Sequence, residues 1–239
     1  MTWSIVARDG AGLLGVAVAS RFFAVGALCA HIRRGVGALS TQALMNPLYG
    51  PAALDLLASG QSAAQAVATL VGADAGRDQR QLHLLPASGP GAAHTGSACV
   101  DWCGHRIYED FTVAGNMLAA AGVLEATAQA FLAMHGQPLA ERLLAAMAAG
   151  EAAGGDKRGK QSAALRIHGD EDYPQLDMRV DDPVEPIVEL QRLYQVSLER
   201  FQPFVSCLAG RHDPTGLIDR SQIDATIARF HAAREQGSR

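Results

Sequence analysis

MTWSIVARDGAGLLGVAVAS, residues 1–20, contains two runs of strand-forming residues, Thr2 to Arg8 and Leu13 to Ser20. Between them lies Asp9-Gly10-Ala11-Gly12, a cluster of residues that tolerate the positive φ angles of tight turns. The stretch therefore predicts a β-hairpin. If its turn centres between Gly10 and Ala11, Thr2 lies across from about Ala19.

The second strand of this hairpin is apolar on both faces, so neither face is suited to water. Further strands are predicted at 27–34, 36–42, 81–85, 92–96, 106–113, 163–168 and 176–180. Helical periodicity is found around 48–56, at 64–70 behind a Ser62 N-cap, at 117–134 and at 139–149. Hairpins that alternate with paired helices indicate an α+β fold, a four-layer αββα sandwich of two antiparallel sheets flanked by helices.

The composition shifts at Asp181-Asp182-Pro183-Val184-Glu185-Pro186, and two amphipathic helical patterns follow it. We therefore expect one domain over residues 1–186 and a helical C-terminal extension over 187–239.

The formal charge of −4 and the absence of a long Lys/Arg run argue against nucleic acid as a partner. No apolar stretch is long enough to span a membrane, and the N-terminal segment is broken by Arg8 and Asp9. The four cysteines do not resemble a secreted disulfide framework. We expect a cytoplasmic protein that makes no membrane contact.

Two cofactor motifs come close to matching. The loop at 154–162 approaches a phosphate-binding loop, but Gln161 takes the place of its hydroxyl residue, and the expected order is helix, loop, strand. His94, Cys99, Cys103 and His105 are residue types that zinc accepts, although their spacing is not a paired C-x-x-C. We expect no metal and no organic cofactor, and keep a zinc protein as a less favoured alternative.

Thr2 has two interpretations. A threonine hydroxyl can be activated by the α-amine of its own residue once Met1 is removed, because such an amine titrates near pH 8 and is partly neutral in cells. Ser20 and Arg21 would lie beside it, and a positive charge at Arg21 would lower the pKa of the amine. Alternatively, Thr2 is a β-branched strand residue and Arg21 a solvated strand end.

Other polar residues lie at the ends of predicted strands. Asn116 could stabilise an oxyanion or cap a helix. The remaining candidates could line a substrate cleft or belong to ordinary loops. They are Gln42, Asn46 and Tyr49 after one strand, and Asp156, Arg158, Gln161 and Ser162 around another.

Several blocks of the chain resemble one protein family. They are TWSIVARD, GVAVASRFFAVG, GVGALSTQALMNPLYGP, AGNML, PLAERLLAAMAAGEAAGGDKRGKQSAAL and MRVDDPVEPIVELQRL. Over about residues 1 to 195 the chain resembles the bacterial domain-of-unknown-function family 1028, which is placed among the N-terminal nucleophile (Ntn) hydrolase folds. The resemblance implies an αββα sandwich and hydrolysis of an amide bond, with Thr2, Ser20 and Arg21 in the positions of the nucleophile and its neighbours.

The expected function is hydrolysis of a C–N amide bond in a small or peptide-like molecule, with Thr2 as nucleophile and Asn116 or backbone amides holding the oxyanion. A non-catalytic protein that binds a small ligand on the same fold is the alternative. We also expect a homodimer or higher homo-oligomer. Some members of the family have a peptidoglycan-binding tail after this domain, but the two helices here could equally cover a dimer partner.

Overall fold

The predicted N-terminal hairpin is present in the computed structural model, which describes residues 2–237. Strands β1 (Thr2–Arg8) and β2 (Leu14–Ser20) pair antiparallel, with Trp3 opposite Ala19. The predicted register, Thr2 opposite Ala19, is therefore wrong by one residue. The cause is the turn: the Asp9 carboxylate accepts hydrogen bonds from the backbone of Ala11 and Leu13, which centres the reversal on Ala11.

β1 is a central strand of a six-stranded antiparallel sheet, whose order is β10-β9-β2-β1-β8-β7. The other strands are β7 (Gly104–Ile107), β8 (Phe111–Asn116), β9 (Ser162–His168) and β10 (Leu176–Val180). The chain's first strand is thus hydrogen-bonded along both edges.

A second antiparallel sheet has four strands in the order β3-β4-β5-β6. They are β3 (Ala30–Arg33), β4 (Gly37–Ala43), β5 (Arg80–Pro86) and β6 (Ala92–Thr95). Between the two sheets lies an apolar cluster that includes Val6, Val16, Ala38 and Leu85. The sheets therefore bury each other's inner faces.

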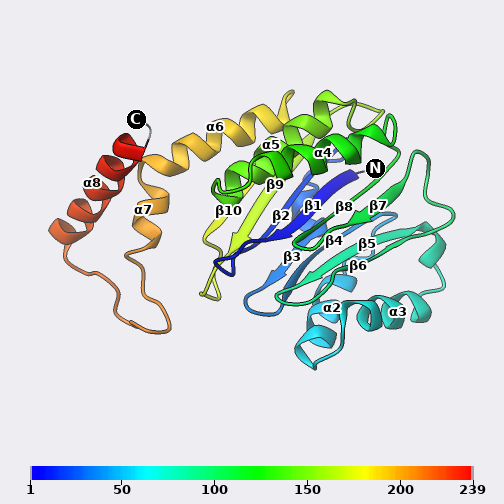
Figure 1. The fold of residues 1–239 in the computed structure, drawn as a ribbon, viewed down its shortest axis with the longest axis horizontal. Helices are drawn as coiled ribbons and strands as arrows, with labels where there is room; N and C mark the ends of the chain where they lie inside the picture. The colour runs from blue at the N-terminus through cyan, green and yellow to red at the C-terminus, as the bar shows by residue number, and fades with distance from the viewer. Residues whose placement is uncertain (1, 238–239) are drawn as a thin grey trace. The chain divides into compact units, whose positions relative to one another are not determined.

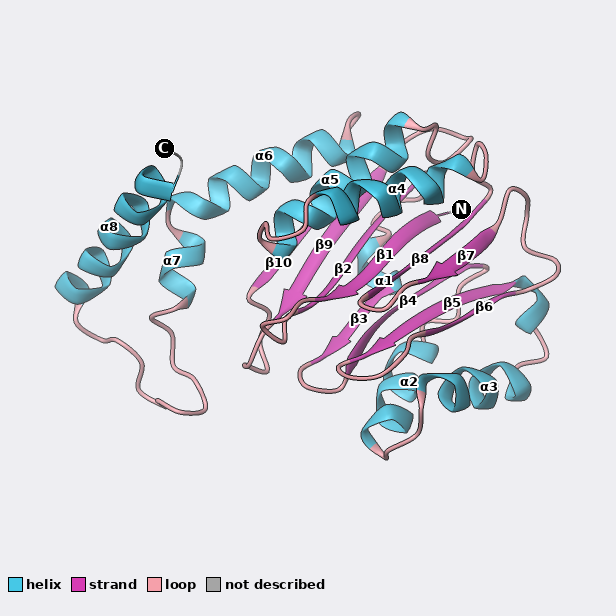
Figure 2. Cartoon of the chain, in the orientation of Figure 1, coloured by secondary structure: helices cyan, strands magenta, loops and turns pink. Residues whose placement is uncertain are grey.

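Helices cover the outer face of each sheet (Figures 1 and 2). α4 (Gly122–Ala133) and α5 (Leu139–Ala152) lie over the six-stranded sheet, and α2 (Tyr49–Ala58) and α3 (Ala63–Ala73) cover the four-stranded one. A short α1 (Gly26–Cys29) follows β2, and a 3-10 turn (Arg77–Gln79) precedes β5. The predicted αββα layer order is confirmed.

The Ser62 N-cap of α3 forms as the sequence predicts. Its hydroxyl accepts a hydrogen bond from the Gln65 backbone, and the Gln65 side chain accepts one from the Ser62 backbone, which completes a capping box. On the inner side of α2 and α3, a cluster that includes Leu39, Ala53 and Leu82 is buried against the four-stranded sheet.

Three predicted elements need correction. The strand at 27–34 starts at Ala30, because residues 26–29 form one helical turn packed closely on β9. The strand at 106–113 is two strands, since the chain reverses where the Tyr108 backbone N–H bonds to the Phe111 carbonyl. The helix predicted from Met117 starts at Gly122. Met117 itself is not helical, because its φ is 51° and its backbone hydrogen-bonds to Val100 and Lys157 in neighbouring loops.

The chain divides into two compact units at Leu190, within α6 (Pro186–Glu199). The second unit continues with α7 (Phe201–Val205) and α8 (Arg220–Gly237), so the C-terminal region is helical as predicted. Within it, Arg200 pairs with Asp224 at 3.3 Å, and the His231 ring donates to the Glu199 carbonyl at 2.9 Å. No helix among residues 2–237 is long and apolar enough to cross a membrane.

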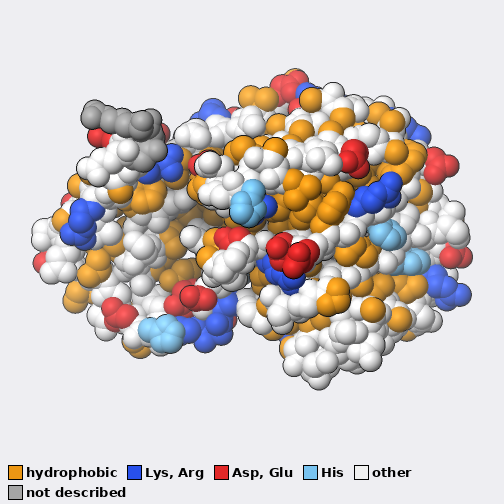
Figure 3. Space-filling model, in the orientation of Figure 1, with side chains coloured by type: hydrophobic (Ala, Val, Ile, Leu, Met, Phe, Trp, Pro, Cys, Tyr) orange, Lys and Arg blue, Asp and Glu red, His pale blue; other side chains and the backbone are white. Residues whose placement is uncertain are grey.

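The charged side chains of the first unit are mixed in sign on the face that Figure 3 shows. Ion pairs of this unit include Arg8–Asp110 and Arg33–Asp55. No extended basic area is visible on that face of the described residues.

Candidate functional site

Four polar residues form a row across one end of the six-stranded sheet. Ser20 is opposite Ser162 in the β2–β9 ladder, and Thr2 is opposite Asn116 in the β1–β8 ladder. The Thr2 hydroxyl donates a hydrogen bond to the Ser20 hydroxyl, with 3.2 Å between the oxygens, which joins the two pairs. We call Thr2, Ser20, Asn116 and Ser162 the strand-end row.

Thr2 is held by its side chain and by its backbone. Its carbonyl accepts hydrogen bonds from Gln42 Nε2 at 3.3 Å and from Asn116 Nδ2 at 3.4 Å. Alternation along β1 puts Thr2 on the same face as Ser4, whose side chain contacts the second sheet. The Thr2 side chain therefore lies on the inner face of its sheet, and Thr2 is only 2% exposed.

A buried polar network supports this carbonyl. The Gln42 side-chain oxygen accepts from the Ser4 hydroxyl at 2.6 Å and from the Ser40 hydroxyl at 3.1 Å. The Gln81 side-chain oxygen accepts from Gln42 at 2.7 Å and from Asn116 at 2.9 Å. Because an unpaired buried polar group costs about 1–3 kcal/mol, these mutual contacts fix the side chains in one arrangement.

His83 extends the network and is completely buried. Its Nε2 lies 2.7 Å from Ser4 Oγ and its Nδ1 lies 2.8 Å from Thr112 Oγ1. Since the only hydrogen of the Ser4 hydroxyl goes to Gln42, the neutral ring donates from Nε2 and accepts at Nδ1. Burial above all, and then the neighbouring His105, lower the pKa of His83 to about 3.

Four residues of this network were not predicted as site residues: Ser4, Ser40, Gln81 and His83. A signal for three of them exists, because polar residues alternate with apolar ones at Thr2 and Ser4 in β1 and at Gln81 and His83 in β5. That alternation places Ser4 on the face of Thr2 and His83 on the face of Gln81. In β4 the polar Thr41 lies between Ser40 and Gln42, so the pattern does not single out Ser40.

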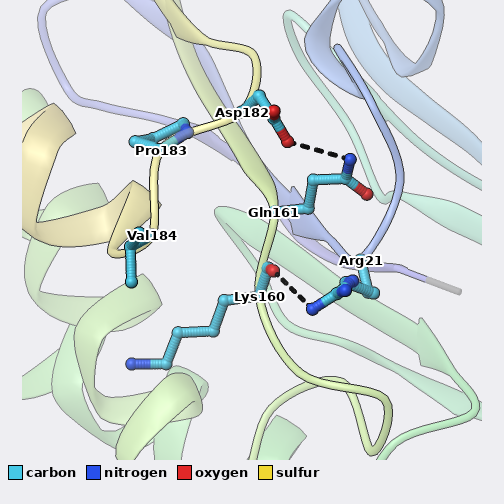
Figure 4. Close-up of a pocket in the computed structure, with 6 residues that line it drawn as sticks. All are labelled: Arg21, Lys160, Gln161, Asp182, Pro183 and Val184. Carbon is cyan, nitrogen blue, oxygen red and sulfur yellow. Dashed lines mark hydrogen bonds between the residues drawn. The ribbon is translucent and has the colours of Figure 1, made fainter.

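Residues next to Ser20 and Ser162 in the chain help to line a surface pocket, whose lining residues Figure 4 shows. Its volume is about 330 Å³, and it is lined by Arg21, Lys160, Gln161, Asp182, Pro183 and Val184. Arg21 follows Ser20 in the chain and Gln161 precedes Ser162. The pocket thus begins one residue beyond the paired ends of β2 and β9.

Asp156 organises the loop beside this pocket. It is buried, and its carboxylate accepts from the Arg21 backbone N–H at 2.8 Å. The same carboxylate pairs with the Arg158 guanidinium at 3.2 Å. Asp156 therefore fixes the start of the segment that carries Arg21, while Arg158 serves mainly as its counter-ion.

The Ser162 hydroxyl is used locally. It accepts from the Val25 backbone N–H at 3.0 Å and donates to the Phe22 carbonyl at 2.5 Å. These bonds hold the turn after β2 against β9. Ser162 thus shapes the edge of the pocket.

Two predicted site residues lie elsewhere. Asn46 forms a local turn, accepting from the Leu48 backbone at 3.1 Å. Tyr49 is buried in the cluster between α2, α3 and the outer face of the second sheet, and its hydroxyl donates to Asp74 at 2.8 Å. Burial, then the Asp74 bond, raise the Tyr49 pKa. The structure does not bring either residue to the strand-end row.

Asn116 does not cap a helix, because the N-cap of α4 is Ala121. Its amide hydrogens are directed at Gln81 and at the Thr2 carbonyl. The Asn116 side chain, which we predicted to stabilise an oxyanion, therefore contacts the backbone of Thr2.

The four residues of the zinc alternative have other partners. His94 bonds to the Arg77 carbonyl at 2.9 Å, His105 to the Thr95 hydroxyl at 2.9 Å, Cys99 to the Arg80 carbonyl at 3.3 Å, and Cys103 to the Cys99 carbonyl at 3.5 Å. Among residues 2–237, no group of three His, Cys, Asp or Glu side chains is placed to hold a metal ion. The zinc hypothesis has no geometric support here.

Fold and site together define an α+β protein of two stacked antiparallel sheets between helical layers, with a polar row at the start of its central N-terminal strand. The chain belongs to the family of unknown function DUF1028, whose model matches residues 2–190. The predicted family membership is thus confirmed.

The comparison with solved structures agrees. A crystal structure of a DUF1028 protein from Silicibacter pomeroyi is 30% identical, with a TM-score of 0.84 over 92% of this chain and 96% of that one. Similarity to Anbu, the ancestral beta-subunit from Yersinia bercovieri, is far lower. Its identity is 12% and its TM-score 0.42, over 82% of this chain and 94% of that one. No match was found among the curated proteins.

Proposed function

We propose that the chain is an amidohydrolase of the N-terminal nucleophile type, which cleaves a C–N amide bond of a small or peptide-like substrate. Thr2 is the nucleophile, after removal of Met1, a residue outside the described ones. One observation carries the proposal: Thr2 begins a central strand, bonds through its hydroxyl to Ser20, and has its carbonyl held by Gln42 and Asn116. The αββα layer order supports it by analogy.

In the proposed reaction, Thr2 Oγ1 attacks the substrate carbonyl carbon while the free α-amine of Thr2 takes the hydroxyl proton. The amine returns this proton to the leaving nitrogen, the C–N bond breaks, and an ester to Thr2 remains. Water then hydrolyses the ester, with the same amine as general base, and restores the Thr2 hydroxyl.

The neighbouring side chains supply position and charge. The Asn116 contact to the Thr2 carbonyl is long, 3.4 Å, so this amide hydrogen is the one that an oxyanion can recruit. Gln42 keeps the Thr2 backbone in place at the same time. The positive charge of Arg21, one residue from Ser20, favours the neutral form of a nearby amine.

The test joins intact mass to two substitutions. Native protein should be one methionine residue lighter than the full chain, and Thr2→Ala should lower amide turnover by about 10³-fold or more. Thr2→Ser is the control, because it keeps the hydroxyl and should keep substantial activity. Retention of Met1 on the native protein, or turnover that survives in Thr2→Ala, would contradict the proposal.

A non-catalytic ligand-binding protein is the second candidate, favoured by the 2% exposure of Thr2. A ligand that raises the melting temperature equally in wild type and Thr2→Ala, with no turnover in either, supports it. Turnover that depends on the Thr2 hydroxyl excludes it.

We also propose a cytoplasmic location and a homo-oligomer. Fractionation of the native cell tests the first, and light scattering during size-exclusion chromatography tests the second. Co-sedimentation with purified peptidoglycan tests the weaker proposal that the C-terminal unit binds cell wall.

A further inference from the structure

The pocket beside the strand-end row contains a cation, Arg21, that has no counter-ion among the described residues. The Arg21 side chain is exposed, and its Nη1 donates to the Lys160 carbonyl at 3.3 Å. Among the described residues no carboxylate pairs with this guanidinium, because Asp156 accepts only the Arg21 backbone N–H. A guanidinium that has no carboxylate partner in the protein can bind a ligand carboxylate through two parallel hydrogen bonds.

Asp182 is the opposite case, an exposed carboxylate that no cation of the described residues pairs with. Its Oδ1 accepts from Gln161 Nε2 at 3.0 Å. Figure 4 shows Gln161 between Asp182 and Arg21, so that the two charges stand on different sides of the pocket.

Lys160 does not alter this balance. Its ammonium bonds to Glu185, and it pairs with Glu151 at 3.0 Å. The hydrogen bond to Glu185 is the main effect that raises the Lys160 pKa, so the ammonium keeps its positive charge. Glu185 and Glu151 are its counter-ions. Figure 4 shows its head pointing away from Arg21. The pocket therefore presents one available positive and one available negative group.

We propose that this pocket binds a zwitterion, with the ligand carboxylate on Arg21 and the ligand ammonium on Asp182. Its ligands are amino acids or short peptides, the charged part of a peptide-like substrate. Pro183 and Val184, the latter 87% exposed, offer an apolar wall for the carbon chain between the charges. The inference rests on the proposed function only in treating the bound zwitterion as part of the substrate.

A simple anion fits the pocket less well. Asp182 would repel a phosphate or a dicarboxylate, and the Lys160 ammonium is already neutralised. An uncharged amide would leave both charges without a partner.

The test measures binding to the full-length chain by calorimetry, so it does not need turnover. The ligands are glycine, β-alanine, γ-aminobutyrate, ε-aminocaproate and diglycine, with hexanoate and hexylamine as singly charged controls. We expect one length of zwitterion to bind best, and to bind about 10- to 100-fold tighter than either control.

Two variants then assign the charges. Arg21→Gln should abolish the advantage of the zwitterion over hexylamine, and Asp182→Asn its advantage over hexanoate. Lys157→Gln and Asp181→Asn are matched controls at neighbouring charges outside the pocket and should change affinity less than about twofold, as surface charges do.

The inference would be overturned if zwitterions and controls bind equally or if no ligand binds. It would also be overturned if Arg21→Gln and Asp182→Asn both leave the affinities unchanged. The same experiment in Thr2→Ala separates it from the proposed function. Zwitterion binding without Thr2-dependent turnover leaves the pocket standing and removes the hydrolase. Thr2-dependent turnover of uncharged amides, with no preference for zwitterions, supports the hydrolase and excludes the zwitterion pocket.

Discussion

Acidification should destabilise the fold through His83, which is fully buried between Ser4 and Thr112. Its pKa falls from 6.5 to about 3 on folding, chiefly because burial disfavours the charged ring. The unfolded chain therefore binds more protons between these values, and stability is lost as pH falls below about 6.5. The full shift corresponds to at most about 5 kcal/mol, and at pH 4.5 to about 3 kcal/mol.

The assay is urea unfolding of wild type and His83→Gln at pH 7.5, 6.5, 5.5 and 4.5. Tryptophan fluorescence suits it, because both tryptophans, Trp3 and Trp102, lie in the first unit. The free-energy difference between wild type and variant should be constant above pH 7 and shrink by about 1.4 kcal/mol per pH unit below 6.

His135→Gln is the control, because it removes an exposed imidazole, and its effect on stability at pH 7.5 should be far smaller than that of His83→Gln. A wild-type minus His83→Gln difference that does not change between pH 7.5 and 4.5 refutes the argument. In that case His83 is either protonated in the folded state or already neutral in the unfolded one.

Other substitutions test separate parts of the structure. Gln42→Leu leaves several buried partners unsatisfied and should destabilise the protein by about 3 kcal/mol or more, measured by urea unfolding; a loss under 1 kcal/mol would show that the network relaxes around it. Ser62→Ala should cost about 1 kcal/mol as a lost N-cap. Gly96→Ala should cost over about 2 kcal/mol, since its Cβ would lie 2.3 Å from the backbone at 77–78, whereas Gly72→Ala, in open space on α3, should stabilise by up to about 1 kcal/mol.

The layer order was predictable because it follows from local periodicity and from strands that are apolar on both faces. The hairpin register was not, since one residue more or less in the turn moves every partner. The pairing of Thr2 with Asn116 joins residues far apart in the sequence, and no local pattern reports it.

Two kinds of site residue escaped prediction for different reasons. Tyr49 follows a strand but belongs to a helix whose buried face packs on the outer side of the second sheet, away from Thr2. Ser4 and His83 meet only because two sheets stack, with 2.7 Å between their polar atoms. Short-range patterns show which face a residue lies on, but not which residue of another sheet faces it.

The central place of β1 also constrains the order of events during synthesis. The partner of Thr2 is Asn116, so the ribosome must release more than a hundred further residues before this ladder can close. Until then Thr2 lacks one of its two neighbouring strands. Afterwards Thr2 is inside a finished sheet. We therefore expect the proposed removal of Met1 to precede the docking of β8.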